Sequence, residues 1–357
     1  MQVKSNIKNY DVKIETNSSF IDKLIRIENA EFVIDKRVYE IYNHLFTNIP
    51  YERLLIIEAT EHNKVIDTAL NICERITEIS AKKNAFLISF GGGIIQDITG
   101  FVANITYRGI NWIYVPTTLL AACDSCIGAK TSLNYKNYKN LLGTFYPPNN
   151  IHIYSDFFLS LSERDFKSGL GEVIKFNIMS GQKGLLNIEE NIESLLTRDV
   201  KTMNRFIESS LFFKKVYIEL DEFDKDKRIL LNFAHTFGHS IEVVSNYEIP
   251  HGTAVAIGMI IANRISNQRG MLTPEIIRRI EKVLLRVIDI DITLMICPIE
   301  KYIKVIKKDK KQINQHITTV LITQYNDMCE LDLIHNTTED EICDAINYFI
   351  YLYKMGK

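Results

Sequence analysis

The sequence predicts two domains: an α/β domain with a parallel sheet over residues 1–160, followed by a mostly α-helical domain over residues 161–357. Three observations support this division. At roughly 150 residues per domain, a chain of 357 residues is long enough for two. In the first part, short β-rich runs alternate with helix-length segments, as in a parallel sheet covered by helices. After about residue 160 the strand signal fades and helical signals dominate.

Five β-rich runs predict the strands of the N-terminal sheet. They are residues 31–35 (EFVID), 54–59 (LLIIEA), 86–90 (FLISF), 112–116 (WIYVP) and 151–154 (IHIY). Between the second and third runs, Val65, Ala69, Ile72 and Ile76 recur at helical spacing, which predicts a helix. We expect residues 1–16, where polar and apolar side chains alternate, to form an antiparallel hairpin at the sheet edge.

Capping signals and one apolar stripe predict the helices of the second half. Ser162 followed by Asp165 resembles a capping pattern, and Thr273 precedes a proline at the first helical position. The stripe repeats at helical intervals and comprises Ile276, Ile277, Ile280, Val283 and Leu284. The β-branched run at residues 317–322 (ITTVLI) is an exception that predicts a short strand pair.

Composition and charge exclude several classes of partner. The 42 Lys and Arg residues against 44 Asp and Glu residues give a net charge of -2, so no net basic field exists to hold nucleic acid or an anionic membrane. The N-terminus lacks the apolar run of a signal peptide, and no apolar stretch reaches the roughly 20 residues that span a bilayer. We therefore expect a cytoplasmic protein.

Six cysteines are present, and only Cys123 and Cys126 lie close together. A Cys-x-x-Cys pair can be redox-active, but a structural zinc site would need a second pair, which the sequence lacks. The alternative, two reduced thiols on a buried segment, is preferred.

Two motifs in the first half are candidates for binding a phosphorylated cofactor. Gly91, Gly92 and Gly93 follow a predicted strand and open a helical pattern, where backbone N–H groups can bind an anion; a tight turn is the alternative. Thr117 and Thr118 end the next predicted strand, where ligands of open α/β sheets bind. A strand simply terminated by these residues explains the second motif equally well.

Residues 122–140 (ACDSCIGAKTSLNYKNYKN) form the third candidate. We expect a loop, and a lysine-rich loop is usually a solvated surface. Because its lysines flank small residues and follow the possible cofactor strand, they also suit binding of phosphate or carboxylate.

The strongest candidate combines one carboxylate with histidines. Glu172 lies on a predicted helix, His235 and His239 are four residues apart on one helical face, and His251 follows. One carboxylate with two or three imidazoles is the ligand set of a catalytic divalent metal with an open coordination position. The alternative is a set of core histidines. A zinc-protease interpretation fails because the first histidine is not followed by glutamate.

Together these motifs resemble the 3-dehydroquinate synthase family, one branch of the sugar phosphate cyclases. The resemblance extends from about residue 31 to about residue 335 and rests on long motifs in the family order. They are GGGIIQDITGF, YRGINWIYVPTTLLAACDSCIGAKTSLN, KNLLGTFY, GLGEVIK, RILLNFAHTFGHSIE, HGTAVAIGM and KKDKK.

The resemblance implies the dehydroquinate synthase-like fold, in which a Rossmann-like N-terminal domain binds NAD and the helical domain binds metal and substrate. It implies Zn²⁺ or Co²⁺ bound by Glu172, His235 and His251. The implied NAD contacts comprise Gly92, Gly93, Asp97, Thr117 and Thr118, with Asp35, Glu61 and Lys64 on the adenosine side and Phe157 and Ser160 near the nicotinamide end. Lys130 and Lys139 are implied to lie between cofactor and substrate.

The resemblance also implies a substrate site and a homodimer. The implied substrate residues are Asp124, Asn140, Lys175, Lys214, Arg228, Asn232 and His239. Arg108 matches a residue that reaches the phosphate bound by the neighbouring subunit, and either Lys310 or Lys311 should complete the phosphate site.

The activity implied is that of 3-dehydroquinate synthase, a carbon–oxygen lyase of the shikimate pathway to aromatic amino acids. It converts a small phosphorylated sugar acid, 3-deoxy-D-arabino-heptulosonate 7-phosphate, to 3-dehydroquinate and phosphate. The implied reaction has four successive steps: transient NAD-dependent oxidation, phosphate elimination, reduction and aldol cyclisation. Because related cyclases use substrates without a carboxylate, Arg228 and Lys214, which suit a carboxylate, favour this branch.

Alternatives remain open at this stage. Gln96, Ala129, Ala234 and Thr253 depart from the family pattern, which raises the possibility of a specialised paralogue acting on another sugar phosphate. Such paralogues make 2-deoxy-scyllo-inosose, valiolone or aminodehydroquinate. A metal-dependent polyol dehydrogenase is a further alternative, but it has no need of the lysine and arginine residues. A non-catalytic binding protein is disfavoured because no expected ligand is missing.

Overall fold

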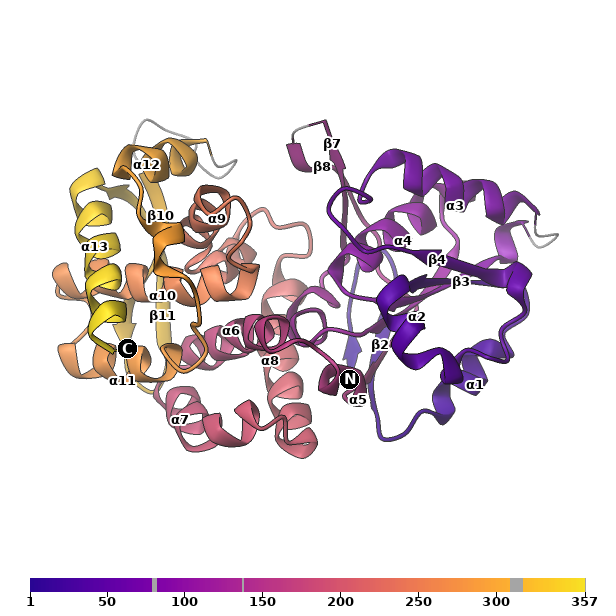
Figure 1. Ribbon diagram of the computed structural model, residues 1–357, viewed down its shortest axis with the longest axis horizontal. Coiled ribbons are helices and arrows are strands. Elements are labelled where there is room, and N and C mark those ends of the chain that lie inside the picture. The colour runs from indigo at the N-terminus through magenta and orange to yellow at the C-terminus, as the bar shows by residue number, and fades with distance from the viewer. Residues whose placement is uncertain (79–81, 137, 309–316, 357) are drawn as a thin grey trace. The chain divides into compact units, whose positions relative to one another are not determined.

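The computed structural model describes residues 1–78, 82–136, 138–308 and 317–356 (Figure 1). The chain forms two compact units. The N-terminal unit comprises Met1–Leu161 together with Ile218–Phe223, and the C-terminal unit comprises Ser162–Tyr217 and Asp224–Lys357. The segment Ile218–Phe223 thus joins the first unit although it lies far along the chain, and no local sequence signal marks it.

A seven-stranded sheet forms the centre of the N-terminal unit, with strand order β1-β2-β9-β6-β5-β3-β4. All neighbouring pairs are parallel except β1 with β2, which is antiparallel. The strands are β1 (Gln2–Val3), β2 (Tyr10–Glu15), β3 (Ala30–Asp35), β4 (Leu54–Ile57), β5 (Phe86–Gly91), β6 (Asn111–Pro116) and β9 (Asn150–Tyr154). The predicted parallel sheet and the hairpin at its edge are therefore confirmed, although β4 ends two residues before the predicted run does.

Helices cover this sheet as the alternating pattern predicts. They are α1 (Ser19–Ile25), α2 (Lys36–Tyr42), α3 (Ile66–Glu78), α4 (Gly93–Ile105) and α5 (Asp156–Leu159). The α4 helix packs across β3, β5 and β6, and α3 packs on α4 (Figure 1). Ala69, Ile72 and Ile76 form the buried face of α3, which confirms the helix predicted there.

The prediction of a loop at residues 122–140 is wrong. A π-helical turn covers Ala121–Ser125, and an antiparallel hairpin follows, with β7 (Lys130–Tyr135) and β8 (Tyr138–Phe145). The lysines concealed a period-two pattern in which Thr131 and Leu133 are buried on one face of β7. Cys123 and Cys126 are buried, as predicted, and their thiols contact the backbone carbonyls of Leu120 and Ala122.

Helices dominate the C-terminal unit, as predicted. They are α6 (Glu163–Met179), α7 (Gln182–Leu196), α8 (Val200–Leu220), α9 (His235–Val244), α10 (His251–Gln268), α11 (Pro274–Leu284), α12 (Ile299–Lys307) and α13 (Glu339–Gly356). Ser162 accepts a hydrogen bond from the backbone N–H of Asp165, and Thr273 caps α11 in the same way, so both predicted caps are confirmed. The predicted apolar stripe of α11 is buried.

The predicted strand pair is also present, as the antiparallel strands β10 (Ile317–Tyr325) and β11 (Cys329–Thr337). The α10 helix is the core of the unit and packs against α6, α9, α11, α13 and β10 (Figure 1). It is buried on nearly every side from Gly252 to Ile261, which explains why its sequence lacks a polar face. None of the helices in the described part of the chain has the length and apolar character needed to cross a lipid bilayer.

Candidate active site

The glycine motif and the threonine motif lie side by side at the carboxyl ends of β5 and β6. Gly91 pairs with Pro116 across these strands, and the backbone N–H of Thr117 donates to the carbonyl of Gly91 over 3.0 Å. A Cβ atom on Gly92 would lie 3.1 Å from the Thr118 methyl group, so the close approach of the two loops favours glycine there.

This location has the geometry of an anion site. Gly92 is the N-cap of α4 and makes no side-chain capping hydrogen bond to the first backbone N–H groups of the helix. The site also lies at the point where the strand order changes direction. From β3 the chain adds β4 toward one edge of the sheet, and from β5 it adds β6 toward the other edge. Ligands of open parallel sheets bind at such switch points, and helix N-termini attract phosphate. Asp35 ends β3 beside this point, and burial raises the pKa of its carboxyl group.

A polar network connects predicted cofactor and substrate residues of the N-terminal unit. Lys64 is buried, forms an ion pair with Asp97 and donates to Asn140 over 2.6 Å. Ser132 on β7 also lies between the two: its hydroxyl oxygen is 3.1 Å from a carboxylate oxygen of Asp97 and 2.8 Å from the amide oxygen of Asn140, and its single proton can be donated to either. Because Lys64 and Asp97 neutralise one another, the network presents little net charge.

Asn134 extends this network to Glu61 and, through Glu61, to Lys139 on β8. Its amide donates to Glu61 over 2.8 Å, and its oxygen accepts from the backbone of Asn140 over 3.0 Å. Lys139 lies 3.7 Å from the Glu61 carboxylate. The sequence analysis did not predict roles for Ser132 and Asn134. Their polar side chains at alternate positions of a strand could have indicated that they share one face.

The other predicted residues of this unit occupy varied environments. Asp124 lies in the π-helical turn, Lys130 begins β7 and is exposed, and Arg108 is exposed on a short helical turn. Phe157 is in the core, with its ring 4.9 Å from that of Tyr42. The hydroxyl group of Tyr42 donates to the Ser160 hydroxyl oxygen over 2.9 Å.

In the C-terminal unit, the predicted metal ligands Glu172, His235 and His251 come together. Oε1 of Glu172 lies 3.5 Å from Nε2 of His235 and 3.5 Å from Nε2 of His251. One ligand atom from each residue lies within 4.8 Å of the others. Donor atoms about 2.1 Å from a tetrahedral ion are about 3.4 Å apart, so the spacing fits one divalent ion.

The hydrogen bonds of the two histidines also fit metal binding. Nδ1 of His235 lies 3.0 Å from the Phe233 carbonyl oxygen, to which it can only donate, so its Nε2 carries the lone pair. Nδ1 of His251 lies 3.1 Å from the Glu242 carboxylate. Burial opposes a charge on His251, but the hydrogen bonds to Glu172 and Glu242 outweigh it and raise its pKa to about 10. A metal ion on Nε2 would take the place of that proton.

Lys175 completes the buried surroundings of Glu172. Its ammonium group lies 2.6 Å from Oε2 of Glu172 and donates to the Leu231 carbonyl over 3.1 Å. Because Lys175 contacts Oε2, the other oxygen of Glu172, Oε1, faces the two histidines and the proposed ion. A carboxylate with no exposed surface needs such a partner.

The remaining predicted substrate residues of the described chain lie on three elements of this unit. Lys214 is on α8 and Arg228 on the short helical segment Lys227–Asn232, with 7% and 4% of their surfaces exposed. Asn232 ends that segment. His239 lies one turn after His235 on α9, with ring centroids 5.5 Å apart. Lys310 and Lys311 lie outside the described residues.

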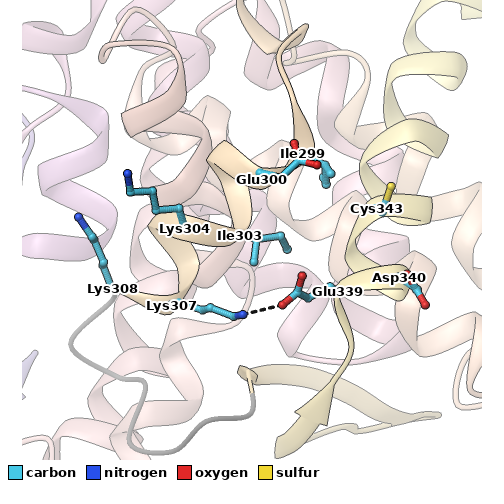
Figure 2. Close-up of a pocket in the computed structure, with 9 residues that line it drawn as sticks. All are labelled: Ile299, Glu300, Ile303, Lys304, Lys307, Lys308, Glu339, Asp340 and Cys343. Atoms are coloured by element: carbon cyan, nitrogen blue, oxygen red, sulfur yellow. Dashed lines mark hydrogen bonds and ion pairs between the residues drawn. The ribbon is translucent and has the colours of Figure 1, made fainter.

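A groove of about 610 Å³ lies between α12 and α13 (Figure 2). Lys307 reaches across it to Glu339, with 2.6 Å between nitrogen and oxygen. None of the residues predicted for the site lines it. Three lysines and three acidic residues line the groove, so it has no net charge to attract an anion. These residues are Lys304, Lys307, Lys308, Glu300, Glu339 and Asp340.

Solved structures share this architecture over nearly the whole chain. The 2-epi-5-epi-valiolone synthase of Streptomyces hygroscopicus, described with NAD⁺ and Zn²⁺ bound, has a TM-score of 0.83 at 23% identity and covers 99% of both chains. A 2-deoxy-scyllo-inosose synthase complexed with carbaglucose-6-phosphate, NAD⁺ and Co²⁺ has a TM-score of 0.84 at 21% identity, covering 98% of this chain and 99% of the other. The fold is thus that of the dehydroquinate synthase-like sugar phosphate cyclases.

Sequence comparison then identifies the branch. Residues 54–168 match the model of the 3-dehydroquinate synthase N-terminal domain, and residues 169–312 match that of the C-terminal domain. The 3-dehydroquinate synthase of Dictyoglomus thermophilum is 35% identical over 311 residues, which are 87% of this chain and 86% of the relative. The chain belongs to the 3-dehydroquinate synthase family.

Proposed function

We propose that this protein is a 3-dehydroquinate synthase, a lyase that converts 3-deoxy-D-arabino-heptulosonate 7-phosphate to 3-dehydroquinate and phosphate in the shikimate pathway. Membership of the family over both parts of the chain supports this assignment. The observation that carries the chemistry is the cluster of Glu172, His235 and His251, whose spacing fits one divalent ion.

We assign NAD binding to the domain of residues 1–160 and metal binding to residues 161–357. The N-terminus of α4 and the loop at Thr117 and Thr118 would bind the pyrophosphate and adjoining ribose, because both present backbone or hydroxyl hydrogen-bond donors at the sheet switch point. Asp35 and Glu61 would serve the adenosine side, and Ser160 the nicotinamide end.

NAD would supply a hydride acceptor and donor for C5 of the substrate, and Glu172, His235 and His251 would hold a divalent ion that could stabilise negative charge on the C5 oxygen. The chain's own residues set up this chemistry. Lys175 neutralises one oxygen of Glu172 and fixes the carboxylate, while the Phe233 carbonyl fixes the ring of His235. His239, one turn from His235, would exchange a proton with a substrate hydroxyl.

Cationic residues would bind the two ends of the substrate. Arg228 and Lys214 are assigned to the carboxylate, for which the planar guanidinium offers two parallel hydrogen bonds. Lys130, Arg108 and either Lys310 or Lys311 are assigned to the phosphate. After oxidation at C5 the adjacent proton is acidic, so the phosphate leaves as this proton is lost and acts as its own base. The C5 ketone is reduced again, and ring opening with aldol closure gives the product.

A homodimer follows from the role assigned to Arg108. Tyr107 and Arg108 both have left-handed backbone conformations, with φ of 49° and 63°, and Gly109 follows with φ of 119°. Successive non-glycine residues in this region are strained, which is common where a side chain must be presented to a ligand. We propose that Arg108 is presented to the partner subunit. Cytoplasmic localisation stays a prediction from the sequence.

Phosphate release tests the proposed function. Purified protein with NAD and Zn²⁺ should release phosphate from 3-deoxy-D-arabino-heptulosonate 7-phosphate without net accumulation of NADH. A matched reaction would use a heptulose phosphate without the carboxylate. Release from that compound alone would refute the assignment in favour of a specialised cyclase. Steady accumulation of NADH with a simple polyol would indicate a dehydrogenase.

A further inference from the structure

His251 lies between two carboxylates, one at each ring nitrogen. Nε2 is 3.5 Å from Oε1 of Glu172, and Nδ1 is 3.1 Å from Oε2 of Glu242. Glu172 is fully buried, whereas the side chains of His251 and Glu242 are 31% and 16% exposed. The ring therefore separates a buried carboxylate from one closer to solvent.

Two possible sets of metal ligands share this histidine. One is Glu172, His235 and His251, and the other is His239, Glu242 and His251. A neutral imidazole has one lone pair, so His251 can bind an ion through one nitrogen only. A proton on Nδ1 directs the lone pair on Nε2 toward Glu172 and His235.

The two metal-binding histidines have different partners for this proton. His235 Nδ1 faces a backbone carbonyl, which cannot take up a proton and so holds Nδ1–H in place. His251 Nδ1 faces the carboxylate of Glu242, and a carboxylate that accepts from the imidazole makes it a stronger ligand. Glu242 lies on α9, seven residues after His235, so one rigid helix supplies both a ligand and the partner of the other ligand.

We propose that Glu242 is a positioning residue of the metal centre: it holds the proton on His251 Nδ1, aims Nε2 at the ion bound with Glu172 and His235, and does not itself bind that ion. This inference rests on the metal site of the proposed function but not on the identity of the substrate. Sequence reasoning missed Glu242 because nothing local distinguishes it from a solvated helix residue.

The test measures binding of Zn²⁺ alone, by competition with a chromophoric chelator, and the visible spectrum of the Co²⁺ form. Variants are Glu242→Ala, Glu242→Gln and Glu172→Ala, with Glu248→Ala as a matched control because Glu248 is exposed. We expect Glu242→Ala to weaken Zn²⁺ binding about 10- to 100-fold with an unchanged Co²⁺ spectrum, because the ligands remain. Glu242→Gln, whose amide oxygen still accepts from Nδ1, should lose less. Glu248→Ala should bind as the wild type does.

Other outcomes would overturn the proposal. Unchanged Zn²⁺ affinity in Glu242→Ala would mean that the hydrogen bond is incidental. A loss as complete as in Glu172→Ala, with an altered Co²⁺ spectrum, would make Glu242 a ligand, and two ions per chain would mean that both sets are occupied. If Glu242→Ala does not fold, ¹⁵N chemical shifts of His251 in the Zn²⁺-bound form of Glu242→Gln decide: a ring that binds Zn²⁺ through Nδ1 and keeps its proton on Nε2 refutes the role. A wild-type protein that binds no ion would refute the metal site itself.

Discussion

Gly171 and Gly252 face one another where α6 crosses α10, so closely that a Cβ atom on Gly171 would overlap the Gly252 carbonyl oxygen. Each glycine is the chain neighbour of a metal-site residue, Glu172 on α6 and His251 on α10. The close approach of the two helix backbones therefore sets the separation of the carboxylate and the imidazole.

Replacement of Gly171 by alanine should force these helices apart. We expect a loss of about 1 to 3 kcal/mol in the free energy of unfolding, the usual cost of overpacking, with weaker Zn²⁺ binding. Gly356→Ala is the control, since a Cβ atom there meets nothing within 4 Å. Chemical denaturation and chelator competition measure the two effects. Wild-type Zn²⁺ affinity in Gly171→Ala would show that the helix contact does not set the site.

Glu172 and Lys175 form a buried ion pair, and removal of one partner leaves the other charge unpaired. In metal-free protein, we expect Glu172→Gln or Lys175→Met alone to cost about 3 to 5 kcal/mol of stability. The double variant should cost clearly less than the sum, because no unpaired charge remains. Urea unfolding in the presence of a chelator measures this cycle. Additive losses would mean that the two groups do not interact energetically.

Gln96 secures the turn that carries Asp124. Its amide donates to the Ser125 carbonyl over 2.7 Å, and the Ser125 hydroxyl donates back to Gln96 over 2.7 Å. Gln96→Ala removes both bonds and should cost about 1 to 3 kcal/mol, with a larger KM. Ser125→Ala keeps the bond to the backbone carbonyl and should cost less. Equal effects of the two variants would contradict this account.

Arg228 is the residue assigned to the substrate carboxylate. Arg228→Ala should reduce kcat/KM for the carboxylate-bearing substrate by at least about 100-fold, and Arg228→Lys should restore only part of it, because an ammonium group cannot make the two parallel hydrogen bonds. Phosphate release over a range of substrate concentrations measures this. Unchanged turnover in Arg228→Ala would show that its role is misassigned.

Glu31 makes stability depend on pH. Burial raises the pKa of its carboxyl group to about 7, although Arg75 and Arg53 oppose the shift. The folded state then holds this proton more tightly than the unfolded state, so the contribution is fully present below about pH 4.5 and is lost as pH rises through about 7. Glu31→Gln should raise the Tm relative to wild type at pH 8 and change it little at pH 4.5. An equal difference at both pH values would exclude titration of Glu31 as the cause.

Local patterns sufficed for most secondary structure. Strands of the parallel sheet are apolar on both faces, and helix α11 has both a threonine cap and an apolar stripe, so each is recognisable from neighbouring residues. The β7–β8 hairpin escaped prediction because its exposed lysines masked the alternation that only burial of one face explains. The cluster of a carboxylate with histidines was predictable because histidines are few and His235, His239 and His251 lie close in sequence.

The sequence by itself determined which residue types are available for the chemistry: a glycine turn after a buried strand, a carboxylate with three histidines, and cations suited to phosphate and carboxylate. Only the tertiary structure decided how they are held. The pairing of Lys175 with Glu172, of Glu242 with His251 and of Lys64 with Asp97 joins residues whose contact depends on side-chain direction and helix separation. Those quantities follow from packing of whole elements, which no local sequence pattern encodes.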